Sequence, residues 1–244
     1  MTGRLRALRI LAAGMAVGGI GFGLFTVIFG LVNPDQASHA FHNPIVASLL
    51  IVLSAPPLIA IARAPERPIR PLVILAAIGV AALATMAMAL TIDPFTLPFV
   101  VLVAVLWAIA TDRAEPFPAG SPSVAMLALS VLAAVALGPY AVEQAELQRT
   151  DRVSEHAAFF HWVEMAFYTA AIPLLGLLAG LRPAPYRMAA WCAAVALAIL
   201  GIASLVYGEY ASAMPAPLAW ALIAGGIVFI GVAEWEARRQ EPAG

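Results

Sequence analysis

The sequence predicts an all-α integral membrane protein with eight transmembrane helices and both termini in the cytoplasm. Three observations lead to this prediction: the composition, the length of the apolar runs and the placement of the arginines. Of the 244 residues, 63% are hydrophobic and 11% are charged, whereas a soluble domain has about 25% charged residues. Such a chain carries too much apolar surface for water, so we expect a single membrane domain over residues 1–244.

Apolar runs of about 20 residues, the length needed to cross a bilayer, recur along the chain. We expect spans at residues 8–32, 44–62, 71–91, 94–111, 122–140, 156–180, 187–208 and 216–235. The first run is too long for a signal peptide and lacks an obvious cleavage site, so we expect it to be retained. The fourth run is short, and seven spans therefore remain an open alternative. The acidic stretch 143–151 is expected to be a solvated outer segment.

The arginines set the orientation. If the N-terminus is cytoplasmic, eight spans place 11 of the 13 basic residues on the cytoplasmic side, as the positive-inside rule requires. These are Arg4, Arg6, Arg9, Arg63, Arg67, Arg70, Arg113, Arg182, Arg187, Arg238 and Arg239. The four histidines of the chain then all lie at the outer face.

The two halves of the chain resemble each other weakly. His42 and His161 each stand at the head of a span, and each is followed 21 residues later by an arginine, Arg63 or Arg182. Four spans in each half would make two parallel repeats, residues 1–113 and 122–239. Chance similarity between apolar helices is the alternative.

Several classes of function are excluded. The net charge of -1 gives no basis for a nucleic-acid partner. The chain contains no lysine, which excludes Schiff-base chemistry and a retinal attachment site. Its single cysteine, Cys192, cannot form an intrachain disulfide.

The candidate functional residues are His39, His42, His156, His161 and Glu164. Ionisable side chains at membrane depth are costly, so they are functional candidates by default. In a continuous helix from residue 156, His156 and His161 are poorly placed to chelate one ion alone, while His161 and Glu164 form an i, i+3 pair. Histidines from the second span could complete a site, as in helix-bundle metal centres. Imidazole suits zinc, copper, iron and nickel. Each histidine alone also fits a helix anchor or cap at the membrane surface.

One family resemblance rests on these segments. The run Ser38-His39-Ala40-Phe41-His42, followed by Leu49-Leu50 and Ser54-Ala55-Pro56-Pro57-Leu58, resembles the CtaG family of multi-span cytochrome c oxidase assembly factors. Glu155-His156-Ala157-Ala158-Phe159 is similar to that family's later histidine-phenylalanine helix start. The resemblance implies a bacterial inner-membrane protein that delivers copper to a terminal oxidase or takes it from a periplasmic carrier, with His39, His42 and His156 as ligands.

The sequence thus predicts a metal-binding protein, with copper favoured, that handles copper or assists oxidase assembly and is more readily understood as a binding protein than as an enzyme. Two alternatives stay open. One is a membrane cytochrome with histidine ligands to haem. The other is a zinc-dependent intramembrane hydrolase with Glu164 as base. A structural subunit without a ligand is the fallback.

Overall fold

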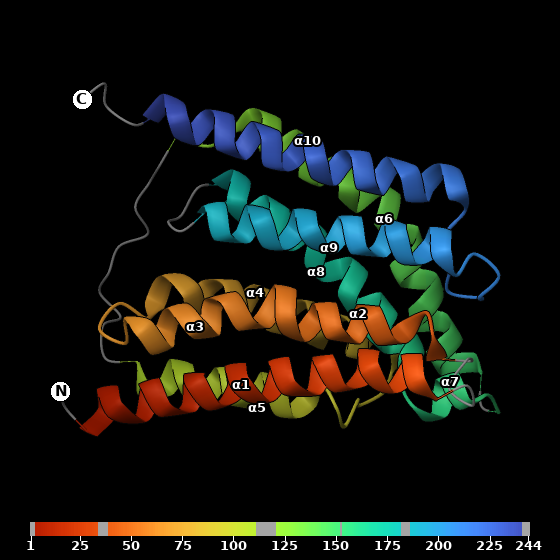
Figure 1. Cartoon of the computed structure of the whole chain (residues 1–244), viewed down its shortest axis with the longest axis horizontal. Helices are drawn as coiled ribbons and strands as arrows, with labels where there is room; N and C mark the ends of the chain where they lie inside the picture. Colours follow the sequence, from red (N-terminus) through yellow and green to blue (C-terminus); the bar gives the residue numbers. More distant parts are fainter. Residues whose placement is uncertain (1–2, 34–38, 111–120, 152, 182–185, 241–244) are drawn as a thin grey trace.

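The computed structural model describes residues 3–33, 39–110, 121–151, 153–181 and 186–240. Within these ranges the chain is helical and has no strand. The elements are α1 (Gly3–Val32), α2 (His42–Ser48), the π-helical segment η2 (Leu49–Ser54), α3 (Ala55–Arg63), α4 (Ile69–Ala89), α5 (Leu97–Ile109), α6 (Val124–Thr150), α7 (Glu155–Ala158), α8 (His161–Leu181), α9 (Tyr186–Val206) and α10 (Ala216–Gln240). Figure 1 shows the long helices running along one axis, with the chain alternating in direction.

Seven helical segments among the described residues are long and apolar enough to cross a membrane, and α2, η2 and α3 together form one of them. The fourth predicted span is present as α5, which has 13 residues. At 1.5 Å per residue it is about 20 Å long, short of the roughly 30 Å hydrocarbon layer. The all-helical fold is therefore confirmed, with seven segments that could cross a membrane, whereas the described part of the fourth predicted run is too short to do so.

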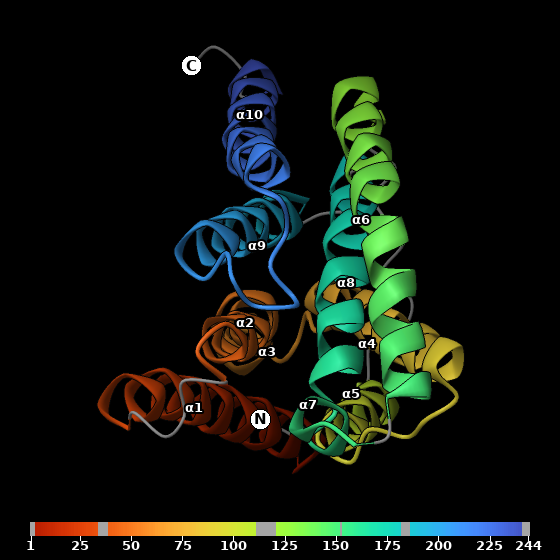
Figure 2. The same cartoon turned by 90° about the vertical axis from the view of Figure 1, so that its right-hand side faces the viewer.

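Helix α8 is the centre of the bundle. Figure 2, seen along the helices, shows it between α6, α4 and α9, while α1 and α10 lie at opposite edges. The apolar window of α8 is 67% buried, against 11% for α1. Side chains of α8 therefore face protein, and those of α1 mostly face the surroundings of the bundle.

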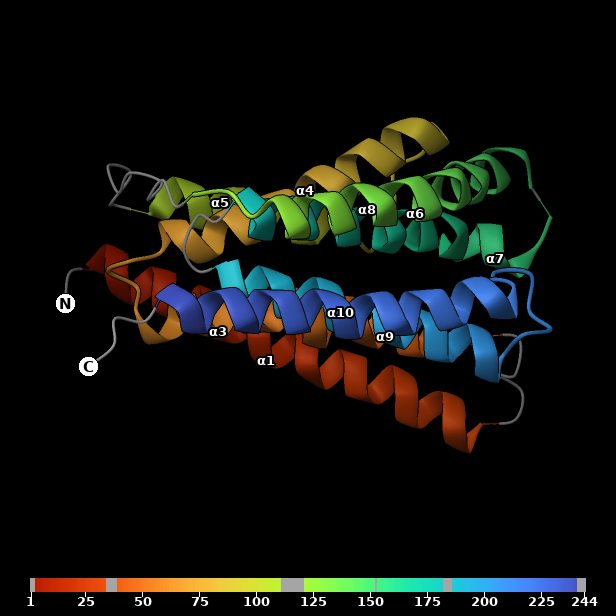
Figure 3. The same ribbon diagram turned by 90° about the horizontal axis from the view of Figure 1, so that it is seen from above.

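Both ends of the chain lie at the same end of the bundle. Figure 3 shows the start of α1 and the end of α10 together at the left, opposite α7. Arginines at the start of α1, the end of α3 and the end of α10 gather at this end, among them Arg4, Arg63 and Arg239. The four histidines lie at the other end, at the starts of α2 and α8 and in α7.

The second spanning segment is widened to a π-helix over Leu49–Ser54, just before Pro56 and Pro57. Proline has no N–H and its ring collides with the carbonyl four residues earlier. The wider π turn accommodates this defect: the N–H of Ala55 donates to Leu50 five residues back, and the Ser54 hydroxyl donates to the Leu49 carbonyl at 2.7 Å. Such π segments are frequent near functional sites.

The sixth predicted span is not one continuous helix. Helix α7 ends at Ala158, α8 begins at His161, and Phe160 between them has φ 63°. A non-glycine residue in the left-handed region is uncommon and breaks the helix. The expectation that residues 156–165 follow one helical wheel is therefore wrong, and the relative directions of His156 and His161 derived from it do not apply.

Helix α6 continues ten residues past its predicted end at residue 140 and includes Pro139. The acidic stretch expected to be solvated is mostly the last turns of this helix. Gln144 there is 1% exposed, and its side-chain oxygen lies 3.4 Å from the Ser212 hydroxyl that donates to it. Because of this extension, side chains of α6 reach the end of the bundle where the histidines lie.

Helices α9 and α10 pack closely through glycine. A methyl group at Gly226 would lie 2.6 Å from the Ala194 carbonyl oxygen, and one at Gly201 would lie 2.5 Å from that of Ala219. Small residues at such interfaces let two helix backbones approach in a membrane.

Candidate metal centre

The rings of all four histidines meet at the end of the bundle where α2 and α8 begin. The ring centroid of His161 lies 4.8 Å from that of His39, 4.5 Å from that of His42 and 5.9 Å from that of His156. His156 is 5.0 Å from His42 and 6.0 Å from His39. The structure thus brings together the four histidines that the sequence singled out.

His42 supplies the deepest imidazole of this cluster. It is the first residue of α2, and 2% of it is exposed. Its Nε2 atom is buried and has no hydrogen-bond partner. Leaving a buried polar atom unpaired costs roughly 1–3 kcal/mol, so an unpaired nitrogen among three other imidazoles calls for a partner that the side chains do not provide.

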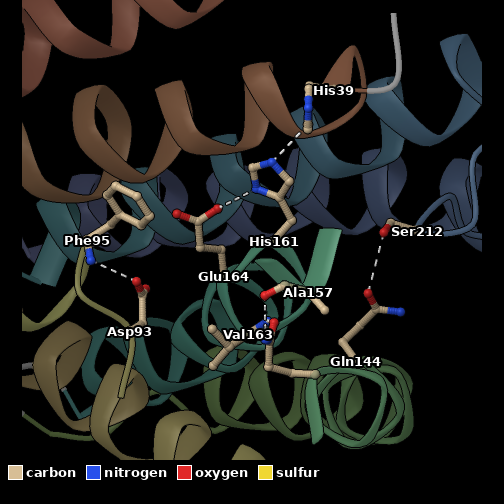
Figure 4. A network of polar contacts seen from close by, with 10 residues as sticks. His39, Asp93, Phe95, Gln144, Ala157, His161, Val163, Glu164 and Ser212 are labelled. Carbon is tan, nitrogen blue, oxygen red and sulfur yellow. Dashed lines mark hydrogen bonds and ion pairs between the residues drawn. The ribbon is translucent and has the colours of Figure 1, made fainter. Parts of the chain in front are cut away.

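His161 is held at both ring nitrogens. Its Nδ1 lies 3.1 Å from Oε2 of Glu164, and its Nε2 lies 2.9 Å from Nδ1 of His39 (Figure 4). The predicted i, i+3 pairing of His161 with Glu164 is therefore confirmed. Glu164 contacts the ring nitrogen of His161 opposite the one that faces His39, so in this arrangement it is placed to orient His161. Met165, one helical turn after His161, is fully buried in the core.

Gln148 and Asp151 contact both sides of the break between α7 and α8, and this break directs His156 toward the cluster. The Gln148 side chain donates to the Ala157 carbonyl at 2.9 Å and accepts from the Val163 N–H at 3.4 Å. Asp151, directly after α6, accepts from the Trp162 ring N–H at 3.1 Å. Trp162 in turn stacks on His156, with centroids 5.0 Å apart.

Asp151 also holds Ser154, the residue that caps the N-terminus of α7. Its carboxylate accepts hydrogen bonds from the Ser154 hydroxyl and backbone N–H and from the Val153 N–H. These bonds, led by the Ser154 hydroxyl, lower the pKa of Asp151 to about 2. It is therefore a fixed negative charge at neutral pH, and it positions Trp162.

The two histidines outside the membrane spans are kept neutral by their surroundings. Burial, followed by the nearby His161, lowers the pKa of His39 below 6.5, and Glu155 opposes this. Burial, then His161 and His39, lowers the pKa of His156 in the same way. A neutral imidazole has a free lone pair, which is the form that ligates metal ions.

A chamber of about 560 Å³ opens beside the cluster. His39, His161 and Glu164 line it, together with Glu155 and phenylalanines of α1. A second cavity of about 170 Å³ adjoins it further into the membrane span and shares Glu164 in its wall. One side of the candidate site is therefore accessible.

Asp93 is a further buried acid at this end. It is 1% exposed, its Oδ1 accepts from the Phe95 N–H at 2.8 Å, and its Oδ2 has no hydrogen-bond partner. Its charge acts on both His161 and Glu164. Asp93-Pro94 forms a turn before α5, which starts at Leu97.

As the side chains stand, no group of three or more His, Cys, Asp or Glu residues in the described ranges could hold a metal ion. The hydrogen bond between His161 and His39 gives one reason. The two ring nitrogens that would bind an ion are in contact with each other instead.

No protein-family model, curated protein or solved structure matches this chain. The case for a function therefore rests on the geometry of the site and on the sequence.

Sequence reasoning missed the residues that shape the site. Gln148 and Trp162 occupy ordinary positions in the sequence, and no local pattern distinguishes them. Phe160 could not be recognised as a break, since phenylalanine rarely adopts positive φ.

Proposed function

We propose that this protein binds a transition-metal ion at His39, His42, His156 and His161. The observation that carries the proposal is the unpaired, buried Nε2 of His42, surrounded by three other imidazoles. A bound ion would satisfy that nitrogen, which nothing else in the described residues does.

The dimensions of the cluster fit such an ion. Four imidazoles bound tetrahedrally at about 2.0 Å place neighbouring ligand nitrogens about 3.3 Å apart and ring centroids about 5 Å apart. The ring-centroid separations run from 4.5 to 6.0 Å, and the His161–His39 nitrogens are 2.9 Å apart. That contact would have to open by a few tenths of an ångström before both nitrogens could bind one ion.

The role of Glu164 supports the same proposal. Histidine ligands of metal ions usually donate a hydrogen bond from their second ring N–H to a carboxylate. This hydrogen bond fixes the tautomer and raises the basicity of the ligating nitrogen. Glu164 occupies this position on Nδ1 of His161, leaving Nε2 for the ion. A cluster of histidines that served only to anchor helices would not require this arrangement.

Copper is the favoured ion and copper handling the favoured task. Imidazole sites bind copper more tightly than other divalent first-row metals, and the resemblance to CtaG-type assembly factors implies delivery to a terminal oxidase in a bacterial inner membrane. On this proposal the arginine-rich end is cytoplasmic and the histidine end is extracytoplasmic. A periplasmic copper carrier or the oxidase itself is the partner.

The test is metal analysis of the purified protein after loading with copper or zinc and removal of excess ion. We expect about one ion per chain in the wild type and in Asn43→Ala, a matched control beside the cluster. His42→Ala with His156→Ala should reduce this to background. Equal metal content in the double variant and the wild type would refute the proposal. A Soret band in the purified protein would assign a haem instead.

A further inference from the structure

The chamber beside the histidine cluster has a lining of unusual composition. Five phenylalanines surround it: Phe22, Phe25 and Phe29 of α1, Phe95 before α5 and Phe159 before α8. The three on α1 form a row along one helix face, with successive centroids 6.2 and 5.3 Å apart. Their rings are between 39% and 54% exposed, so the row faces open space and not the core.

Two acidic side chains, Glu155 and Glu164, stand in the same wall, each beside one of the two histidines that also line it. Glu155 is largely exposed and lies 3.9 Å from Nε2 of His39, whereas Glu164 lies deeper, with 12% of its side chain exposed, and contacts His161. None of the described lining residues is an arginine, and the chain has no lysine. A ligand with a phosphate or carboxylate head group therefore finds no positive partner here.

Glu164 stands where the two cavities adjoin. One of its carboxylate oxygens contacts His161, and Figure 4 shows the other turned away, toward the side where Phe95 lies. The inner cavity beyond it is lined mainly by apolar side chains, including Leu49, Leu50, Phe99 and Phe167. The space thus passes from an acidic, aromatic chamber to an apolar one.

From this lining we infer that the chamber binds a lipophilic organic cation. Carboxylates attract a positive centre, most strongly where they are shielded from water as Glu164 is, and aromatic ring faces attract cations. A volume of about 560 Å³ lies within the roughly 300–1,000 Å³ of small-molecule sites. The apolar body of the ligand lies against the phenylalanine row, and its positive centre lies between Glu155 and Glu164. The chamber shares His39, His161 and Glu164 with the proposed metal site, but the inference does not require a bound ion.

The test compares two probes of the same shape and opposite charge, tetraphenylphosphonium and tetraphenylborate. Equilibrium dialysis of the cation against detergent-purified protein should show saturable binding of about one per chain, above that of empty micelles. The anion should not displace it. Glu164→Gln should raise the Kd at least about tenfold, while the exposed control Glu146→Gln leaves it unchanged. Phe25→Leu and Phe95→Leu, which keep apolar bulk, should raise it about two- to fivefold.

Three results would overturn the inference: partitioning equal to that of empty micelles, equal displacement by the anion, or an unchanged Kd in Glu164→Gln. Helical circular dichroism of each variant checks that it is folded, and the phenylalanine variants test the site without touching Glu164. The His42→Ala, His156→Ala double variant should keep the cation site, so loss of the metal proposal and loss of this one are distinguishable.

Discussion

At the residue scale, His161 is the side chain on which the site depends. It contacts His39 through Nε2 and Glu164 through Nδ1, and it stacks on His42 with an interplanar angle of 14°. It therefore connects α2, α8 and the turn before α2. Its orientation decides whether the four imidazoles face one point.

Replacing Glu164 with glutamine tests that orientation. The glutamine amide can still contact His161. It lacks the negative carboxylate that accepts a hydrogen bond from Nδ1 and so fixes the tautomer of the ring. We expect metal affinity to fall about 10- to 100-fold, as for other carboxylates that support a ligating histidine, measured by competition with a chelator of known affinity. Glu146→Gln, at an exposed position of α6, is the control. An unchanged affinity would show that Glu164 does not support the ion.

The lowered pKa values of His39 and His156 predict a pH dependence of stability. In the unfolded chain these imidazoles take up a proton near pH 6.5, whereas in the folded chain they do so only at lower pH. Their contribution is therefore present above pH 6.5 and is lost as pH falls toward the folded pKa values. We expect the metal-free protein to unfold at a lower temperature at pH 5.5 than at pH 7.5. In His39→Gln with His156→Gln, the decrease should be smaller; an equal decrease would contradict this assignment.

At the scale of the elements, the break between α7 and α8 makes the cluster four-membered. A continuous helix would keep His156 and His161 five residues apart on one helical wheel, as the sequence suggested. The left-handed Phe160, with Gln148 and Asp151 bracing both sides, brings the two rings to 5.9 Å. The Tyr168 hydroxyl fixes the position of α8 along its neighbours α9 and α2, since it donates to the Ala196 carbonyl of α9 and accepts from Ser48 of α2.

Phe160 offers a direct test of the break. Valine is β-branched and avoids positive φ, at a cost of roughly 1–2 kcal/mol, so Phe160→Val should favour a continuous helix and lower the metal content. Phe160→Gly loses the same ring but keeps the left-handed backbone, and it should retain metal. Equal metal content in the two variants would show that the break does not position His156.

The helices and the histidine end could be predicted because both follow from composition. Runs of about 20 apolar residues allow few structures in lipid, and histidines at the heads of two such runs lie at the same surface when the chain alternates in direction. The break at Phe160 and the extension of α6 through Pro139 could not, because both depend on contacts between distant residues: Gln148 on both sides of the break, and Gln144 against Ser212. The proposed repeat of residues 1–113 and 122–239 stays a prediction.

At the scale of the whole molecule, charge is divided between the two ends. Arginines gather where α1 begins and α10 ends, and the histidines and the buried Asp93 lie at the opposite end. In a membrane this division would set the orientation. On the proposed orientation, the histidine end would face outward and receive its ion from the extracytoplasmic side.

Single cysteines at the two ends test this orientation. Val153, at the histidine end, is 96% exposed, and Arg67, between α3 and α4, is exposed as well. In a Cys192→Ala background, Val153→Cys should react with a membrane-impermeant maleimide in intact spheroplasts. Arg67→Cys should react only after permeabilisation. The reverse pattern would place the histidine cluster in the cytoplasm.

The central claim is that imidazoles from α2, α7 and α8 surround one ion. X-ray absorption at the metal edge of the copper-loaded protein counts those ligands directly. The structure predicts three or four imidazole nitrogens at about 2.0 Å, with one fewer in His42→Ala. A spectrum with one imidazole or none, or one unchanged by His42→Ala, would contradict the account.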